Sequence, residues 1–487
     1  MLPLKGRRMP IAYDVITRFW RLATKVFFKQ VEVVGDEHIP TTGPVVFVGN
    51  HPNSLMDPML VVTTCHARRI RFAAKDVLFQ NPLARMVLNA MGAVPIKRKM
   101  DHKDKPISNE EAFAALHAIL DEGGAFGIFP EGISHFKTEL QPLKTGAARL
   151  VLEAHARGVD VAIVPVGLNY RRRTRMRTQV LVQYGAPFFV TDAEVAQQLD
   201  DDAKEAVAKG EDADRQKARS LTELIDDALR AQTVNAPDFE TLRTLDTVRR
   251  LYAPTDRRLS LSERSELHRR LLDHYERLQH LPEIKSLYDD VVLYNFKLDA
   301  LGLKDRDLRT PLSRLWGTFR VARHLFRLGV MVPVALPGLA LHLPVLATAV
   351  LTAETLVSRK DVHAATKLFV ATGLVVSGYI GIMAWVLWTV PFPTSIAWAS
   401  LALLGLLASG YAAISVLERQ KLLRHGLKVL MVLLQLKREV QWLRARREAL
   451  AQAIHDVVDR YVDPSLDRIV ASPTDETTEA AEAVADL

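Results

Sequence analysis

The residues best suited to chemistry are His51 and Asp57, which follow an apolar strand-like segment, VVFV from Val45. A histidine held by a carboxylate is a standard general base near neutral pH, because the carboxylate fixes one ring nitrogen and leaves the other free to take a proton. Asp57 would lie in the first turns of a helix capped by Asn53 or Ser54. The alternative is a capping turn with an incidental His and Asp.

Three adjacent cations, Lys97, Arg98 and Lys99, end a short apolar strand expected from Ala93. An arginine at a strand end can hold a phosphate through two parallel hydrogen bonds. The alternative, a solvated basic loop, is the commoner case for adjacent cations.

A further strand, expected from Ala125, leads into the sequence Phe129-Pro130-Glu131-Gly132. Glycine after an apolar strand allows the backbone to approach a ligand closely. Glu131 could hydrogen-bond the hydroxyls of a substrate or orient Arg98. The alternative is that the four residues form only a turn that ends the strand.

Ser134 follows Gly132 as in half of a hydrolase nucleophile elbow. Phe136 stands where that motif requires its second glycine, so Ser134 is excluded as a nucleophile.

Strand-like and helix-like segments alternate from residue 31 to 190 and position these residues. The expected strands are VEVV from Val31, VVFV from Val45, IRFAA from Ile70, AVPI from Ala93, AFGIF from Ala125, VAIVPV from Val161 and QVLVQY from Gln179, with helices at 109–121 and 145–157 among others. This pattern predicts an α/β domain over residues 31–200, with a mixed, largely parallel sheet flanked by helices. Active residues tend to lie at the carboxyl ends of such strands.

The N-terminal segment, residues 1–30, contains an amphipathic helix over 10–29. Its apolar stripe, which lies beside a basic one, consists of Ile11, Val15, Phe19, Leu22 and Val26. The helix could lie on an anionic membrane surface or pack its stripe against a core. The pattern of residues 201–320 predicts an all-α appendage. At its start, residues 200–216 are expected to form a linker or an exposed helix.

Three uncharged runs, 331–353, 368–390 and 394–417, each exceed the roughly 20 residues that span a bilayer core as helix. Basic residues flank the first run, separate it from the second and follow the third, and the positive-inside rule places all three basic segments in the cytoplasm. Three crossings cannot satisfy that rule. We therefore expect a membrane region over 321–417 in which 331–353, broken by prolines, is re-entrant, while 368–390 and 395–417 span. A three-span topology is the alternative.

Residues 418–465 predict a long amphipathic helix, as a coiled coil that would permit oligomers or as a membrane-surface helix. Residues 466–487 are acidic, and a disordered tail is expected.

Composition narrows the functional classes. The net charge of +8 favours anionic partners, and the single cysteine, Cys65, excludes an intrachain disulfide or a cysteine-based metal cluster. Charged residues near the N-terminus argue against a secretory signal. The arginines of 171–177 accompany no nucleic-acid motif, so we expect no nucleic-acid partner.

In order and spacing, four blocks resemble the glycerol-phosphate acyltransferase family: Asn50-His51…Asp57, Gly92…Arg98, Phe129–Gly132 and Val164-Pro165-Val166. Lys75 and Lys144-Thr145-Gly146 are also similar to family features. Two departures stand out. Five residues instead of four separate His51 from Asp57, and Pro95 replaces a phenylalanine. The extra residue should lie in the loop before the helix and leave the His–Asp contact intact.

The resemblance implies a membrane-bound enzyme of phospholipid synthesis in which His51 and Asp57 are catalytic. It implies a substrate-binding set comprising Asn50, Lys75, Lys97, Arg98, Glu131, Gly132 and Lys144. The acyl donor would be acyl-CoA or acyl carrier protein, and the acceptor glycerol-3-phosphate or dihydroxyacetone phosphate, with no metal or cofactor. Alternatives are acylation of lysophosphatidic acid or another lysophospholipid, and a non-enzymatic lipid-binding scaffold. The catalytic domain would face the cytoplasm, from the bacterial inner membrane or the endoplasmic reticulum.

Overall fold

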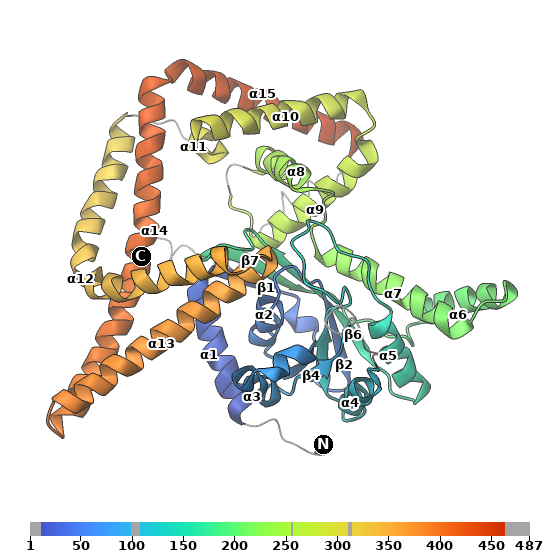
Figure 1. Cartoon of the computed structure of the whole chain (residues 1–487). Coiled ribbons are helices and arrows are strands. Elements are labelled where there is room, and N and C mark those ends of the chain that lie inside the picture. The colour runs from blue at the N-terminus through green and yellow to red at the C-terminus, as the bar shows by residue number, and fades with distance from the viewer. Residues whose placement is uncertain (1–10, 99–107, 255–256, 310–313, 463–487) are drawn as a thin grey trace. The chain divides into compact units, whose positions relative to one another are not determined.

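The structure is a computed structural model that describes residues 11–98, 108–254, 257–309 and 314–462. It divides into two compact units (Figure 1): residues up to Asn235 with Pro344–Ser377, and Ala236–Leu343 with the residues from Gly378 onward. Lys99, the start of the predicted N-terminal segment and the predicted acidic tail at 466–487 lie outside the described residues.

The first unit is built on one mixed sheet. Its strands are Phe28–Val34 (β1), Val45–Gly49 (β2), Ile70–Lys75 (β3), Val94–Ile96 (β4), Ala125–Ile128 (β5), Ala162–Tyr170 (β6) and Thr178–Tyr184 (β7). Their spatial order is β1-β7-β6-β2-β5-β3-β4. All neighbours pair in parallel except β6 and β7, which are antiparallel. The predicted largely parallel sheet is therefore confirmed, and every expected strand is present.

Helices cover both faces of this sheet. The helices of the first unit's N-terminal part are Ile11–Phe27 (α1), Met56–Thr64 (α2), Pro82–Ala90 (α3), Glu110–Asp121 (α4), Gly146–Ala156 (α5), Ala193–Ala208 (α6) and Ala213–Gln232 (α7), with 3₁₀ turns at Asp36–His38 (η1) and Asp76–Gln80 (η2). Residues of α1 and α2 form one hydrophobic cluster, and residues of α4, α5 and α7 form the other. Because both faces are covered, the central strand β2 is buried throughout, which explains its unbroken apolar sequence.

The helices α6 and α7 extend the first unit beyond the boundary predicted at residue 200. Leu221, Ile225 and Leu229 of α7 are almost fully buried in the cluster that contains α4 and α5. Residues 200–216 are thus mainly helical instead of a linker. The density of charge on α6 and α7 concealed the apolar stripe that docks α7 on the sheet.

The apolar stripe of α1 faces outward. Ile11 is 83% exposed and Leu22 61%, whereas Tyr13, Thr17, Thr24 and Phe27 of the same helix are buried. The helix therefore packs through its other side, and the interpretation of the stripe as a core-packing face is wrong.

The second unit is helical. Its elements are Phe239–Tyr252 (α8), Leu261–Leu278 (α9), Pro282–Leu301 (α10), Asp305–Arg309 (α11), Thr394–Gln435 (α14) and Lys437–Tyr461 (α15), with parts of Arg314–Thr355 (α12) and His363–Thr389 (α13). A 3₁₀ turn at Lys360–Val362 (η3) precedes α13. Leu443, Leu450 and Ile454 of α15 are buried in one cluster with residues of α8, α9 and α10. This C-terminal helix is thus part of the helical core of its own unit.

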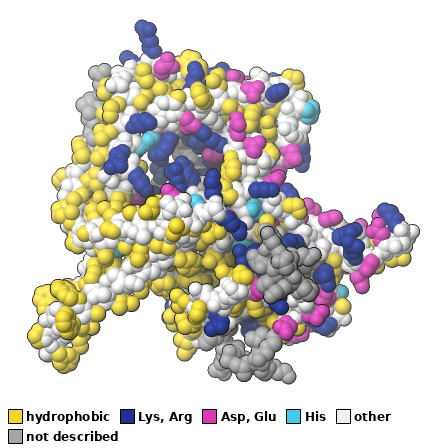
Figure 2. All heavy atoms as spheres, in the orientation of Figure 1, with side chains coloured by type: hydrophobic (Ala, Val, Ile, Leu, Met, Phe, Trp, Pro, Cys, Tyr) yellow, Lys and Arg dark blue, Asp and Glu magenta, His cyan; other side chains and the backbone are white. Residues whose placement is uncertain are grey.

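The described residues contain three helices long and apolar enough to cross a membrane, over Ala322–Thr355, Lys360–Thr389 and Thr394–Val432. The third continues to Gln435, so the helical pattern expected from 418 is divided between the end of α14 and α15, which begins at Lys437. Figure 2 shows hydrophobic side chains over the α13–α14 hairpin, the arm at lower left. Ile380 and Leu404 are each 64% exposed there.

The first apolar helix, α12, is a single element that bends part-way along its length (Figure 1). Pro333 and Pro337 each remove a backbone donor from it, which is a sufficient cause for a bend. Gly338 lies so close to Ser409 and Gly410 of α14 that a Cβ would collide with their backbone. The two helices therefore touch through small residues, as is common between helices in membranes.

We expect Leu221→Ala to lower the free energy of unfolding by about 2–5 kcal/mol, because it leaves a cavity under α7. Thermal unfolding of the detergent-solubilised protein measures the effect. The control is Val207→Ala on α6, whose side chain is 60% exposed, and little change is expected. An unchanged midpoint for Leu221→Ala would contradict the assignment of α7 to this core.

Candidate active site

The site begins where the central strand β2 ends. Asn50 follows the last strand residue, its Oδ1 accepts from Leu168 N at 2.8 Å, and its Nδ2 donates to Leu168 O at 3.3 Å. These two bonds attach the end of β2 to β6. The amide of Asn50 is therefore engaged within the fold, and its predicted contact with substrate stays a prediction.

His51 and Asp57 meet directly. The Nδ1 of His51 lies 2.8 Å from Oδ2 of Asp57. An ionised carboxylate can only accept, so Nδ1 carries the proton and Nε2 is the basic nitrogen. The expectation that the loop absorbs the extra residue is confirmed: α2 begins at Met56, and Ser54 takes a positive φ of 49° in the turn before it.

Two further donors hold the Asp57 carboxylate. Asn53 N–H donates to Oδ2 at 2.7 Å, and the Tyr170 hydroxyl donates to Oδ1 at 2.6 Å. The predicted cap by Asn53 or Ser54 is absent, since the first turn of α2 has no side-chain cap. Instead, the amide of Asn53 donates to Arg173 O at 3.2 Å.

Burial dominates the electrostatics of this group. Asp57 is fully buried. Burial raises the pKa of the Asp57 carboxyl above its ordinary value, and the bonds from His51, Tyr170 and Asn53 oppose that rise. Burial, together with the Asp57 charge, also raises the pKa of Tyr170 well above 10, so the phenol remains a donor.

The plane of the His51 ring is set by stacking. It lies 4.2 Å from the Phe129 ring at an interplanar angle of 3°, and Phe129 in turn stacks on Phe72 at 5.5 Å. The His51 side chain retains 16% of its exposure. Nδ1 of the ring thus bonds Asp57, while part of the His51 side chain stays accessible to a substrate.

The loop after β5 grips the backbone of His51. Glu131 Oε1 accepts from His51 N at 2.7 Å, and Oε2 accepts from Gln141 N at 2.8 Å and from the His135 ring. The backbone N–H of His135 donates to His51 O at 3.2 Å. Glu131 is 3% exposed, so its carboxylate is occupied in shaping the site. A contact of Glu131 with the acceptor stays a prediction, and positioning of His51 is the role its contacts support.

Two predicted cations converge on Gly132. Arg98 Nη1 donates to Gly132 O at 3.4 Å, and a Cβ on Gly132 would collide with the Lys144 side chain. Gly132 has φ +71°, a second reason for glycine there. Lys97, which is exposed, adjoins Arg98, and Lys75 ends β3 beside Ile96 of β4. The arrangement thus joins His51 and two cations, Arg98 and Lys144, to the same loop, through Glu131 and Gly132.

Tyr170 and Arg173 are the residues that sequence reasoning missed. Tyr170 ends β6, and Arg173 belongs to the 171–177 arginine group, for which the sequence predicts no role in the site. Arg173 Nη1 donates to Lys137 O at 2.6 Å. Burial lowers the pKa of Arg173, and the nearby charge of Asp57 opposes that change. The available signal was their position at the carboxyl end of a strand beside β2.

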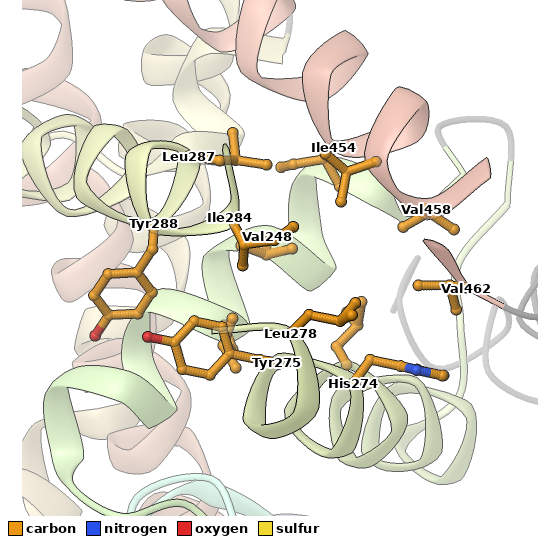
Figure 3. Close-up of a pocket in the computed structure, with 13 residues that line it drawn as sticks. Val248, His274, Tyr275, Leu278, Ile284, Leu287, Tyr288, Ile454, Val458 and Val462 are labelled. Carbon is orange, nitrogen blue, oxygen red and sulfur yellow. The ribbon is translucent and has the colours of Figure 1, made fainter. Parts of the chain in front are cut away.

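The rest of the described chain was compared with this site for groups that could bind a metal ion or a ligand. No group of three or more His, Cys, Asp or Glu within the described residues could hold a metal ion. The helical unit contains a cavity of about 70 Å³ among α8, α9, α10 and α15, drawn in Figure 3. Leucine, isoleucine and valine side chains line most of it, and the rings of Tyr275 and Tyr288 stack at its edge, 5.1 Å apart. Nothing in it resembles the His51–Asp57 arrangement.

Comparison with known proteins gives matches over both units. The acyltransferase family model matches residues 30–169, and a model described as the glycerol-3-phosphate acyltransferase 2 C-terminal domain matches residues 244–466. Glycerol-3-phosphate O-acyltransferase 2 of Saccharomyces cerevisiae is 36% identical over 49% of this chain and 31% of its own length. An uncharacterized acyltransferase of Schizosaccharomyces pombe is 24% identical over 74% of this chain and 66% of its own.

A 1-acyl-sn-glycerol-3-phosphate acyltransferase of Borreliella burgdorferi is 30% identical over 28% of this chain and 51% of its own length. The chain thus spans between about a third and two thirds of these relatives. The acyltransferase model lies within the first unit, and the C-terminal model covers most of the second unit together with residues 344–377 of the first. The chain thus contains an acyltransferase domain over residues 30–169 and, over residues 244–466, a region similar to the C-terminal domain of glycerol-3-phosphate acyltransferase 2.

Proposed function

We propose that this protein transfers a fatty acyl group from a thioester, acyl-CoA or acyl carrier protein, to a hydroxyl of glycerol-3-phosphate or dihydroxyacetone phosphate. The observation that carries the proposal is the buried Asp57 holding His51, with Arg98 and Lys144 beside the loop that grips the His51 backbone. The C-terminal family model favours glycerol-3-phosphate as acceptor.

The geometry supports the following steps. Nε2 of His51 removes the proton of the acceptor hydroxyl, and the oxygen attacks the thioester carbonyl carbon. The carbonyl oxygen gains negative charge, which N–H groups or cations of the site stabilise. The C–S bond then breaks, and the imidazolium returns its proton to the leaving thiolate. Asp57 stabilises the imidazolium between these two transfers.

Arg98 and Lys144 would hold the acceptor phosphate. Both lie at Gly132, one residue from the carboxylate that bonds His51 N. A phosphate bound there places the glycerol hydroxyls within a short reach of the imidazole. Lys75 is the last residue of β3, and Lys97 follows the last residue of the neighbouring strand β4. Both would add to the positive field. No metal or cofactor is required by this scheme.

The second candidate function is acylation of lysophosphatidic acid. The relative from Borreliella burgdorferi, which is named for that acceptor, matches 28% of this chain. Both acceptors carry the same phosphate, so the phosphate site does not distinguish them. Purified protein assayed with two donors and three acceptors would.

We propose that the enzyme is an integral membrane protein with residues 331–353 re-entrant. Arg359 and Asp361, which follow α12, bond Ser134 of the catalytic unit. Between residues 11 and 309, no described helix qualifies as a span. We therefore place the two ends of α12 on one side of the membrane, which favours re-entry over a single crossing by α12.

The depth of α12 agrees with this topology. His342 Nε2 lies 3.1 Å from Oη of Tyr379, whose hydroxyl donates to Leu406 O at 3.1 Å. Tyr379 and Leu406 stand at the middles of the predicted spans 368–390 and 395–417. The part of α12 around His342 would therefore lie near the bilayer midplane. The exposed stripe of α1 would lie in the cytoplasmic surface of the same membrane.

His51→Ala is expected to reduce transferase activity by about 10²- to 10⁴-fold with folding intact, because the general base is lost. Release of free thiol from acyl-CoA in the presence of glycerol-3-phosphate measures it. The matched control is His117→Ala, which removes another carboxylate-paired histidine, at 2.9 Å from Glu153. Equal activity in wild type and His51→Ala would exclude His51 as the base, and an inactive wild type would favour the scaffold alternative.

Tyr170→Phe is expected to reduce kcat about 10-fold, because a hydrogen bond to a charged, buried group is lost. The Tyr170 hydroxyl stabilises ionised Asp57, so its removal raises the pKa of that carboxyl further. The acidic limb of the pH–rate profile should therefore move to higher pH, while the alkaline limb stays. A shift of the acidic limb to lower pH would contradict the assignment.

Membrane topology can be tested with an impermeant thiol reagent, since native Cys65 is buried. In sealed vesicles, Ser358→Cys should be labelled from the same side as Lys204→Cys in α6, and Thr394→Cys from the opposite side. Labelling of Ser358→Cys and Lys204→Cys from opposite sides would establish the three-span alternative.

A further inference from the structure

The connection between α12 and α13 is built into the catalytic unit, although it is more than 200 residues from the His51 motif in the chain. Ala364, Ala365 and Leu368 are at most 5% exposed and belong to the hydrophobic cluster that contains residues of α1, α2 and β2. Such burial means that the connection is a packed element of this unit.

Polar contacts extend this packing to the loop after β5. Ser134 Oγ donates to Asp361 Oδ2 at 2.6 Å. Arg359 Nη2 donates to Ser134 O at 2.7 Å, to Ser134 Oγ at 2.9 Å and to Asp361 Oδ2 at 2.6 Å. Ser134 is 5% exposed and Asp361 4%, so both polar groups depend on this partnership. We refer to these three residues as the 134–361 cluster.

Ser134 lies between the contacts that hold His51. On one side, Glu131 accepts from His51 N, and on the other, the His135 N–H donates to His51 O. A shift of Ser134 therefore moves both groups that fix the backbone of the general base.

The same connection also contacts the loop that follows β6. Lys367, 7% exposed, donates from Nζ to Thr174 O at 3.3 Å. The adjacent Arg173 accepts from Asn53 Nδ2 through its carbonyl and donates to Lys137 O. The connection thus touches two loops, each one residue away from a contact to the His51–Asp57 segment.

We infer that residues 359–368 are a positioning element of the active site, in which Asp361 and Ser134 hold the 131–135 loop so that His51 keeps its working geometry. This goes beyond the proposed reaction in assigning a catalytic task to a segment between two apolar helices, and its kinetic tests rest on the proposed function. Neither residue touches substrate or the imidazole, so they act through Glu131 and His135.

Kinetics of four variants test the inference. Asp361→Ala and Ser134→Ala should each lower kcat about 10-fold or more, with the KM for glycerol-3-phosphate within about 2-fold, because small displacements of reacting groups are costly while the phosphate site is unchanged. Asp361→Asn keeps an acceptor for Ser134 and should fall between Asp361→Ala and wild type. Ser358→Ala, at an exposed position of the same connection just outside residues 359–368, is the matched control and should behave as wild type.

The double variant Ser134→Ala/Asp361→Ala should be no slower than the slower single variant, because both substitutions break one contact. Multiplicative losses, or an effect on KM alone, would overturn the positioning role. So would kcat values equal to wild type.

Hydrogen exchange gives a readout that does not require activity. Asp361→Ala should accelerate exchange in peptides covering residues 129–138 and 49–56, whereas the β1 and β7 peptides should stay as in wild type. Accelerated exchange everywhere would indicate general unfolding and reject the local role. If wild type lacks transferase activity but exchange changes locally, the proposed function fails while the positioning element stands.

Discussion

The buried carboxylate of Asp57 is the constraint on which the catalytic unit depends. A carboxylate removed from water is costly unless several donors replace the lost hydration. Here the donors are the His51 ring, the Asn53 amide N–H and the Tyr170 hydroxyl, and they come from the loop after β2 and from the end of β6. Satisfying one group therefore brings two strand ends and the first turn of α2 to the same point.

The same constraint explains the extra residue between His51 and Asp57. The loop must present the Asn53 N–H to the carboxylate and still deliver the ring of His51 to it. Ser54 takes a positive φ in this turn, which a residue other than glycine adopts only when its surroundings require it. The departure from the family spacing is thus accommodated by the loop backbone, and the histidine–carboxylate contact is unaffected.

Sequence reasoning succeeded where a side chain's own pattern carries the information. Runs of β-branched residues predicted every strand, and the His51–Asp57 spacing after β2 predicted the contact at 2.8 Å. It failed where the partner is a backbone group. Glu131 has the residue type of a ligand-binding carboxylate, yet it accepts from two main-chain N–H groups, which no sequence pattern identifies.

Contacts between distant segments were hidden for a related reason. The sequence argues against Ser134 as a nucleophile and assigns it no other role, yet Ser134 bonds Asp361, 227 positions later. Neither residue's neighbours in sequence indicate the other. Arg359 and Lys367 were interpreted only as cytoplasmic charges, although both bond the catalytic unit. A charge that reports membrane topology can also hold an active-site loop, because the side of the membrane that attracts cations is the side on which we place the catalytic unit. In the re-entrant topology that we propose, the end of α12 would bring the chain back to the loop that holds His51.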